Sequence, residues 1–424
     1  MRQSTFVRLT VIVSVVALVA TACGGSKKSS STSSGSSKTL AAAPGFDPAT
    51  NTIHLGVISP LTGPVAVIGK PLTAGTETWF KYVNEALGGI GGKYKVTLDE
   101  EDSQYTPQLG VQAYNKIKGG DVMIAQLLGT PVTKAVLPLL KQDGVVAAPA
   151  SLDADWVRDP NLLPVGGPYQ IQMINAADYA VNNLGLKSKT VCTMIQDDSY
   201  GQAGQQGVDF AAQKLGFTVK TTAKFTQAAP DFTAQIQQLR SAGCSLVFLT
   251  STPGDTANIF AKAAGLGFAP QWIGQSPSYI GALATSPLGP YLAAHFLLVS
   301  EGTEWGDTAV KGMADLIARV KTYDPTQPPD YYFSFGYYEA WAVTQVLDEA
   351  VKLGDLSRAG VMNAMAKVGT LSFDGLAGNY KYGPPADRVP PVQSTIFKID
   401  PSKPIGLATV AYNITSDAAK AYKF

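Results

Sequence analysis

The sequence has few of the side chains on which most catalytic and metal sites are built. Among its 424 residues there are two histidines, His54 and His295, and three cysteines. Both histidines lie in apolar runs, so a Ser-His-Asp triad or a histidine-based metal site would have little to work with. There is no G-x-S-x-G nucleophile motif. Carboxylates are plentiful, but no pair of them is distinctive. We therefore predict a protein that binds without catalysis and uses no cofactor and no metal.

An excess of positive charge is also absent. Lys and Arg number 33 and Asp and Glu number 32, which gives a net charge of +1. Phosphate contacts need a basic surface, so nucleic acid is not expected as a partner. Beyond the N-terminus no segment approaches the roughly 18 consecutive apolar residues of a membrane-spanning helix. The main body of the chain is therefore expected to lie outside the membrane.

The N-terminus has the pattern of a secretion signal over residues 1–22. Arg2 and Arg8 precede an apolar segment, residues 9–20, which is too short to span a bilayer and ends in small residues. The junction Ala20-Thr21-Ala22-Cys23-Gly24 resembles a bacterial lipoprotein lipobox. The resemblance implies that Cys23 is acylated after cleavage and anchors the protein to the cell membrane. The alternative is ordinary secretion, with no role for Cys23.

A flexible tether is expected between this cysteine and the folded body. Residues 24–37 read GGSKKSSSTSSGSS, a Gly/Ser-rich composition typical of flexible linkers. Taken over residues 23–51, the tether would have a root-mean-square span of roughly 30 Å. The body is then expected to begin at Thr52.

The stretch IHLGVISPLTGPVAVIG, residues 53–69, predicts a strand and a loop ahead of a helix. Its first half is apolar and β-branched, as in a buried parallel strand, and Ser59-Pro60 ends it. Residues 61–64 are rich in turn formers, and a helical apolar pattern starts at Leu72. A P-loop is excluded because five residues rather than four separate Gly63 from Gly69, and Pro71 occupies the magnesium-binding position. In an open α/β sheet such a loop borders the ligand site.

Strands and helices alternate through the rest of the body, which predicts parallel sheets. In the first part, strands are expected at residues 53–59, 94–98, 121–128 and 145–148, with helices between them and a loop at the acidic segment after residue 98. The same rhythm restarts after residues 164–168, with strands at 189–196, 217–225, 245–250 and 271–274. A third part carries a strand at 293–300 and helical patterns at 310–320 and 342–353.

Two cysteines lie in the second repeat. Cys192 and Cys244 are each in or beside an apolar run, TVCTMI and CSLVFL. In an oxidising compartment the two could form a disulfide. Two buried free thiols are the alternative, and the sequence leaves both open.

Several motifs together resemble those of branched-chain-amino-acid-type solute-binding proteins of ABC importers. They are PLTG after the first strand, Ala135-Val136-Leu137-Pro138, the DDSYG motif that contains Tyr200, and Pro230-Asp231-Phe232. The resemblance spans roughly residues 52–400. It implies the type I periplasmic-binding-protein fold, an α/β fold with two Rossmann-like lobes, parallel central sheets and three crossovers. The crossovers would fall near residues 166–168, 300–302 and 389–391. The first lobe would comprise 52–167 and 301–390, and the second 168–300 and 391–424.

The resemblance also implies a set of ligand-binding residues. The loop after the third strand supplies a hydroxyl to a ligand carboxylate, from Thr130 or Thr133. The remaining positions are Ala150, Ser151, Tyr200, Ser276 and Phe333. Hydroxyl groups and N–H groups at helix N-termini can hold an anion without a cationic side chain, and aromatic walls bury an apolar tail.

One departure from the family pattern affects the expected ligand. Amino-acid binders of this family place an acidic residue for the ligand ammonium after the strand at residues 271–274, where this chain has Ser276. Asp255 is the nearest acid in the other loop of the second lobe. A buried ammonium without a carboxylate is costly. A carboxylate or an amide therefore fits as well as an amino acid.

The resulting prediction is an extracytoplasmic solute-binding protein that captures a small amino-acid-like, carboxylate or amide ligand between its lobes. Its partners would be the ligand and ABC permease subunits in the membrane, and the protein would be a monomer held there by a lipid on Cys23. A ligand-sensing receptor without transport is the first alternative. An extracytoplasmic enzyme is the second.

Overall fold

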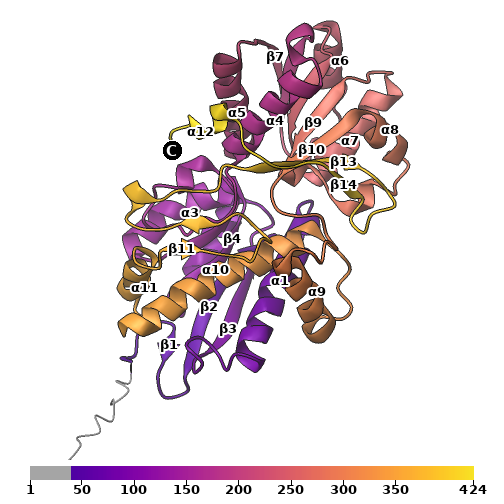
Figure 1. Ribbon diagram of the computed structural model, residues 1–424. Coiled ribbons are helices and arrows are strands. Elements are labelled where there is room, and N and C mark those ends of the chain that lie inside the picture. Colours follow the sequence, from indigo (N-terminus) through magenta and orange to yellow (C-terminus); the bar gives the residue numbers. More distant parts are fainter. Residues whose placement is uncertain (1–39) are drawn as a thin grey trace, which may run out of the picture. The chain divides into compact units, whose positions relative to one another are not determined.

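The computed structural model describes residues 40–424. The expected signal peptide and the acylated Cys23 lie outside the described residues. Figure 1 shows two lobes, each with a central sheet and helices on both sides. Within residues 40–424 no helix combines the length and the apolar character needed to cross a membrane.

The sheet of the first lobe is parallel except at one short strand. Strand β2 pairs with β3 on one side and β4 on the other, β5 follows β4, and β1 runs antiparallel to the start of β2. Every residue of β4 is buried, as expected for a central parallel strand. The bounds are β1 Phe46–Asp47, β2 Thr52–Ser59, β3 Lys95–Asp102, β4 Met123–Leu128 and β5 Ala147–Ala150.

Six helices belong to this lobe. In Figure 1 the long helix α10 lies beside α1, and Trp79 of α1 stacks on Trp341 of α10 with ring centroids 5.0 Å apart. The C-terminal part of the chain thus returns to complete the first lobe. The bounds are α1 Ala66–Glu85, α2 Pro107–Ile117, α3 Thr130–Asp143, α9 Lys311–Tyr323, α10 Tyr331–Leu353 and α11 Arg358–Met365.

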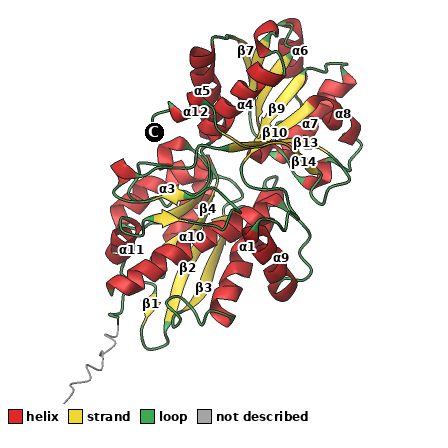
Figure 2. Ribbon diagram, viewed as in Figure 1, coloured by secondary structure: helices red, strands yellow, loops and turns green. Residues whose placement is uncertain are grey.

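The second lobe holds a seven-stranded sheet in the order β14-β13-β10-β9-β8-β6-β7. Its strands from β6 to β10 are parallel, and the two C-terminal strands join antiparallel (Figure 2). The strands are β6 Val191–Gln196, β7 Val219–Phe225, β8 Leu246–Thr250, β9 Gln271–Gln275, β10 Phe296–Ser300, β13 Ser394–Ile399 and β14 Leu407–Ile414. The helices are α4 Tyr169–Asn183, α5 Ser199–Leu215, α6 Thr233–Ser241, α7 Pro253–Gly265, α8 Gly289–His295 and α12 Asp417–Lys420.

The chain passes between the lobes three times, as the fold predicted from the sequence requires. It leaves the first lobe between β5 and α4, returns after β10, and enters the second lobe again between the hairpin β11–β12 and β13. Strands β11 and β12 are Thr370–Leu371 and Tyr380–Lys381. This confirms the type I periplasmic-binding-protein fold class. Two lobes joined by several short crossovers can rotate about them as a hinge.

Packed structure begins earlier than Thr52, the expected start of the body. Leu40 is 6% exposed and Phe46 is 3% exposed. Strand β1 pairs with β2, and the Phe46 ring meets Tyr94 edge to face at 5.1 Å. Residues 40–51 were assigned to the tether as an extension of the Gly/Ser-rich tract. Leu40 and Phe46 gain packing partners only in the tertiary structure.

Two local expectations near the first loop were also wrong. Strand β3 continues through the acidic residues to Asp102, which is opposite Ser59 of β2. An edge strand has one open side, where charged residues remain hydrated. Helix α1 begins at Ala66 rather than at Leu72. Gly69 lies inside this helix, and position 69 requires glycine because a Cβ there would be 2.1 Å from the Pro60 carbonyl oxygen.

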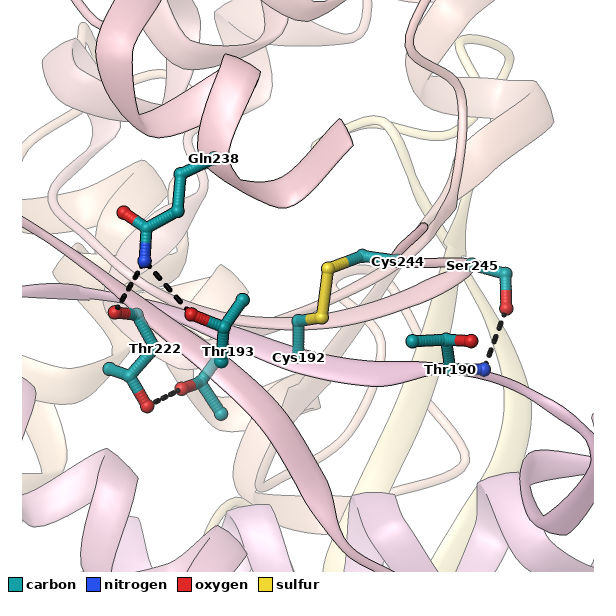
Figure 3. The surroundings of a disulfide bond; sticks show 8 residues. Thr190, Cys192, Thr193, Thr222, Gln238, Cys244 and Ser245 are labelled. Carbon is teal, nitrogen blue, oxygen red and sulfur yellow. Dashed lines mark hydrogen bonds between the residues drawn. A yellow bond between two sulfur atoms is a disulfide. The ribbon is translucent and has the colours of Figure 1, made fainter. Parts of the chain in front are cut away.

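Cys192 and Cys244 form a disulfide in the structure. Figure 3 shows it between β6 and the segment that leads into β8, with the Thr190 N–H donating to Ser245 Oγ alongside at 3.0 Å. The bond closes a separation of 52 residues in the second lobe.

Candidate ligand-binding site

A cavity of about 520 Å³, counting the part open to solvent, lies between residues of the two lobes. The cavity contains aromatic rings, aliphatic side chains and hydroxyl groups, and its lining includes no charged side chain. The lining residues are Ile68, Leu72, Tyr105, Leu128, Gly129, Thr130, Ala150, Ser151, Leu152, Tyr169, Tyr200, Thr252, Ser276, Pro277, Tyr331, Tyr332 and Phe335.

Thr130 lines the cavity at the point where β4 ends and α3 begins. Gly129 makes the turn with a φ of 105°, and a Cβ there would be 2.7 Å from the Tyr105 ring, so only glycine fits. Thr130 is 1% exposed, and its Oγ1 has no hydrogen-bond partner among the described residues. Buried hydroxyls rarely remain unsatisfied. This atom is thus available to a ligand, at a helix N-terminus that favours negative charge.

Thr133, the other candidate of the same loop, does not line the cavity. Its Oγ1 donates to the Leu127 carbonyl oxygen at 3.4 Å, and its N–H donates to Gly129 O at 2.8 Å. Its hydroxyl therefore satisfies the backbone of its own loop.

Ala150 and Ser151 line the cavity where β5 ends. Ser151 Oγ accepts a hydrogen bond from Trp156 Nε1 at 3.1 Å, which orients the hydroxyl and leaves its own proton to donate. Together with Thr130, the first lobe thus presents two hydroxyl groups to the cavity.

Tyr200 lines the cavity from the second lobe, on the first turn of α5. Asp198 caps this helix by accepting from the N–H groups of Tyr200 at 2.9 Å and Gly201 at 3.1 Å. The Tyr200 hydroxyl donates to Ser251 O at 3.2 Å, and its ring meets Tyr169 edge to face at 5.1 Å. Burial raises the pKa of Tyr200 well above its usual value, so this wall is neutral.

Ser276 also lines the cavity, just after β9. Asp255 does not, and its two carboxylate oxygens accept from Thr252 Oγ1 and Ala228 N, each at 3.0 Å. Burial raises the pKa of Asp255 to about 6. Asp255, the acidic residue closest in sequence to Ser276, therefore already accepts hydrogen bonds from the protein and does not line the cavity.

Phe333 is not part of the cavity, although an aromatic binding position was expected at or near it. Its side chain is fully buried against the ring of Trp305, with centroids 6.3 Å apart. Its neighbours Tyr331, Tyr332 and Phe335 line the cavity instead. Successive residues of a helix point about 100° apart, so a displacement of one or two positions changes the face.

Several other lining residues were missed by the sequence analysis. The lining residues on α10 could have been predicted from the sequence. Residues 331–338 read YYFSFGYY, a concentration of aromatic residues in a chain whose aromatic content is 9%. Tyr169 follows the expected first crossover directly, which is where residues of both lobes meet. Tyr105 had no local signal, because it lies in the loop after an edge strand that was expected to end earlier.

The described residues include no group of three His, Cys, Asp or Glu side chains placed to hold a metal ion. Two Rossmann-like lobes with an uncharged, hydroxyl- and aromatic-lined cavity between them define a class of protein that captures a small molecule by lobe closure.

The comparison with family models places the chain in one family. A model described as "Periplasmic binding protein" matches residues 52–404. The chain belongs to this family, and the family name implies an extracytoplasmic location. This also confirms the resemblance that the sequence motifs indicated.

Individual relatives are named for binding, and none of those cited here is named as an enzyme. The chain is 34% identical over 217 residues to Leu/Ile/Val-binding protein homolog 3 of Brucella melitensis, a match over 50% of this chain and 58% of that relative's length. A fatty acid ABC transporter substrate-binding protein from Thermomonospora curvata has a similar fold, with a TM-score of 0.83, 24% identity and coverage of 90% and 97%. A branched chain amino acid ABC transporter protein from Thermus thermophilus with bound valine superposes with a TM-score of 0.75, 18% identity and coverage of 87% and 98%.

Proposed function

We propose that this protein is the solute-binding component of an ABC importer and that its ligand is a small apolar carboxylate without an ammonium group. Structural neighbours named for ABC transport support the first part. The named ligands of those neighbours are a fatty acid and valine. Both carry a carboxylate and an apolar group, and only valine carries an ammonium.

The carboxylate would bind at the N-terminus of α3. Thr130 Oγ1 is buried without a partner, and the first N–H groups of a helix have no acceptor within the helix. Several such donors together hold an anion without a lysine or arginine. The unpartnered hydroxyl of Thr130 is the observation on which the proposal chiefly rests.

The lack of an ammonium site follows from the second-lobe side of the cavity. No carboxylate lines it, and both oxygens of Asp255 accept hydrogen bonds from the protein. An ammonium buried there would lose its hydration without gaining an ionic partner, at a cost of several kcal/mol.

The apolar part of the ligand would lie against the tyrosines. Tyr200 and Tyr332 donate their hydroxyl protons to the backbone oxygens of Ser251 and Tyr279, at 3.2 and 2.8 Å. The polar ends of these side chains are thus satisfied by the protein, and ring surface remains for the ligand. The bond from Tyr332 to Tyr279 also joins α10 of the first lobe to the second lobe.

Lobe closure would then depend on ligand contacts with both lobes. Thr130 belongs to the first lobe and Tyr200 to the second, so a bound molecule touches both only when they are close. It therefore favours the closed arrangement through its differential contacts. A micromolar ligand would supply about 8 kcal/mol at the standard state.

The proposal includes membrane anchoring through a lipid on Cys23, presentation of the ligand to permease subunits, and a monomeric body. The sequence of residues 20–24 supports the anchor. Cys23→Ser should move the protein from the membrane fraction to the soluble fraction of cells. An unchanged distribution would contradict the anchor.

The ligand class can be tested by calorimetric titration of the purified protein with matched probes. The three probes have similar apolar chains and different charged groups. Hexanoate carries a carboxylate, pentylamine an ammonium, and norleucine both. Hexanoate should bind most tightly. Its carboxylate can accept hydrogen bonds from the donors at the N-terminus of α3, and it carries no ammonium that would be buried without a partner. Tighter binding of norleucine than of hexanoate would show that an ammonium site exists and would refute this part of the proposal.

A pair of threonine variants tests the carboxylate site. Thr130→Val should weaken hexanoate binding about tenfold or more, since a hydrogen bond to a charged group contributes roughly 1.5–3 kcal/mol. Thr133→Val is the matched control, because its hydroxyl bonds the backbone away from the cavity. Equal effects of the two substitutions would place the carboxylate elsewhere.

A further inference from the structure

We infer that Tyr331 is the wall that limits the length of the ligand, and that the space behind it is an extension of the binding site, separated from it by Tyr331, for an apolar chain. This inference rests on the proposed function, because it concerns the same ligand. It adds a residue that determines specificity and a second compartment.

The second compartment has a volume of about 340 Å³, counting the part open to solvent. It shares one lining residue with the ligand cavity, and that residue is Tyr331. The Tyr331 side chain therefore stands between the two spaces. The compartment is lined by Glu301, Gly302, Thr303, Trp305, Met313, Tyr331, Ser334, Tyr338, Leu376 and Ile405.

Tyr331 is held in place from two directions. It is the first residue of α10, whose cap Asp330 accepts from the N–H groups of Tyr332 at 2.7 Å and Phe333 at 3.1 Å. Its hydroxyl accepts a hydrogen bond from Ser300 Oγ, at the end of β10, at 2.7 Å. The Tyr331 ring is therefore held in one position, as a side chain that separates two spaces must be.

The compartment suits an apolar chain better than a second charged group. Trp305, Met313, Leu376 and Ile405 supply an apolar lining. Its one carboxyl, Glu301, already accepts from the Tyr338 hydroxyl at 2.6 Å and from the Gly167 N–H. Both carboxyl oxygens of Glu301 therefore have a partner within the protein, and methylene groups can lie against this lining without breaking these hydrogen bonds.

The length limit can be measured with hexanoate, decanoate and tetradecanoate on the wild-type protein, Tyr331→Ala and Tyr331→Phe. The wild type should not gain affinity from hexanoate to tetradecanoate. Tyr331→Ala should raise the ratio of tetradecanoate to hexanoate affinity at least tenfold, because each newly buried methylene contributes about fourfold. Tyr331→Phe keeps the ring and should keep the wild-type ratio.

A filling variant separates this compartment from any other route for the chain. Ser334 lines the second compartment and not the ligand cavity. Adding Ser334→Phe to Tyr331→Ala should restore the wild-type ratio while hexanoate still binds. If the ratio stays high, the chain leaves the cavity by another path and the inference is wrong.

The remaining outcomes distinguish a failure of the Tyr331 wall from a failure of the proposed carboxylate-binding function. Hexanoate binding with an unchanged ratio in Tyr331→Ala would refute the wall and leave the proposed function standing. A wild-type protein that already prefers tetradecanoate would show that Tyr331 is no barrier. If none of the three acids binds the wild type, the carboxylate function itself is refuted, and this inference with it.

Discussion

The buried carboxyl of Glu301 should make the stability of the protein fall as pH rises toward neutrality. Glu301 follows β10 at the second crossover and is 4% exposed. Burial raises its pKa from 4.5 to about 7, although the Tyr338 hydroxyl and the Gly167 N–H both favour its ionised form. The folded protein therefore keeps this proton up to about pH 7, whereas the unfolded chain releases it near pH 4.5.

The sign and size of the effect follow from this difference. Between the two pKa values the unfolded state binds fewer protons than the folded state, so the free energy of unfolding decreases as pH increases. The contribution is fully present below the unfolded pKa and is lost as pH rises through the folded one. A shift from 4.5 to about 7 corresponds to about 3 kcal/mol.

Glu301→Gln isolates this contribution because glutamine imitates the protonated carboxyl. Its Oε1 can accept from Gly167 N–H while its Nε2 donates to the Tyr338 oxygen. As the pH rises from about 5 to about 8, the free energy of unfolding of the variant should increase by about 2–3 kcal/mol relative to that of the wild type. Urea unfolding followed by tryptophan fluorescence at several pH values measures this difference.

A surface glutamate provides the matched control. Glu349 pairs with Lys352 at 3.3 Å in a partly exposed position, so Glu349→Gln should change the free energy of unfolding by less than about 1 kcal/mol. Parallel stability–pH curves for the wild type and Glu301→Gln would refute the reasoning, because they would mean that Glu301 ionises equally easily in both states.

Three further substitutions test other parts of the structure. Tyr200→Ala should weaken hexanoate binding by about tenfold, since part of the aromatic wall is lost. Calorimetric titration of the folded variant measures this, and an unchanged affinity would place the site elsewhere. Replacing both Cys192 and Cys244 by alanine should lower the free energy of unfolding by about 4 kcal/mol for a 52-residue separation; a loss below about 1 kcal/mol in urea titrations would argue against a stabilising disulfide. Phe46→Ala should cost about 3 kcal/mol because it empties a buried site against Tyr94; an unaltered melting curve would show that β1 is dispensable.

Much of the fold was predictable from the sequence because its signals are local. The alternation of apolar β-branched runs with helical apolar patterns predicts parallel sheets, and the restart after residue 168 predicts two similar lobes. The errors occurred where a tertiary partner outweighs local composition. Strand β3 extends to Asp102 because it pairs with β2 along its whole length. Gly69 lies within α1, where the Pro60 carbonyl leaves no room for a side chain, so its glycine marks a close contact rather than the end of a loop.

The candidate site was predictable to the level of the loop and not of the side chain. The loops after β4, β5 and β9 do line the cavity, as parallel strands with a common edge require. The choice between Thr130 and Thr133 depends on how α3 is rotated, which its own sequence leaves open. The same holds for Phe333 and its neighbours on α10.

The sequence by itself determined the class of this protein, because strand and helix periodicity and the order of its motifs are properties of short segments. Its resemblance to the family also predicts that Ser276 stands where the family places an acid. Only the tertiary structure bears on what a serine there means, because packing shows that Asp255 already accepts two hydrogen bonds and that no carboxylate among residues 40–424 lines the cavity. The proposal about Tyr331 and the prediction about Glu301 rest on the tertiary structure as well. Both depend on contacts between residues far apart in the chain, and no local pattern encodes such contacts.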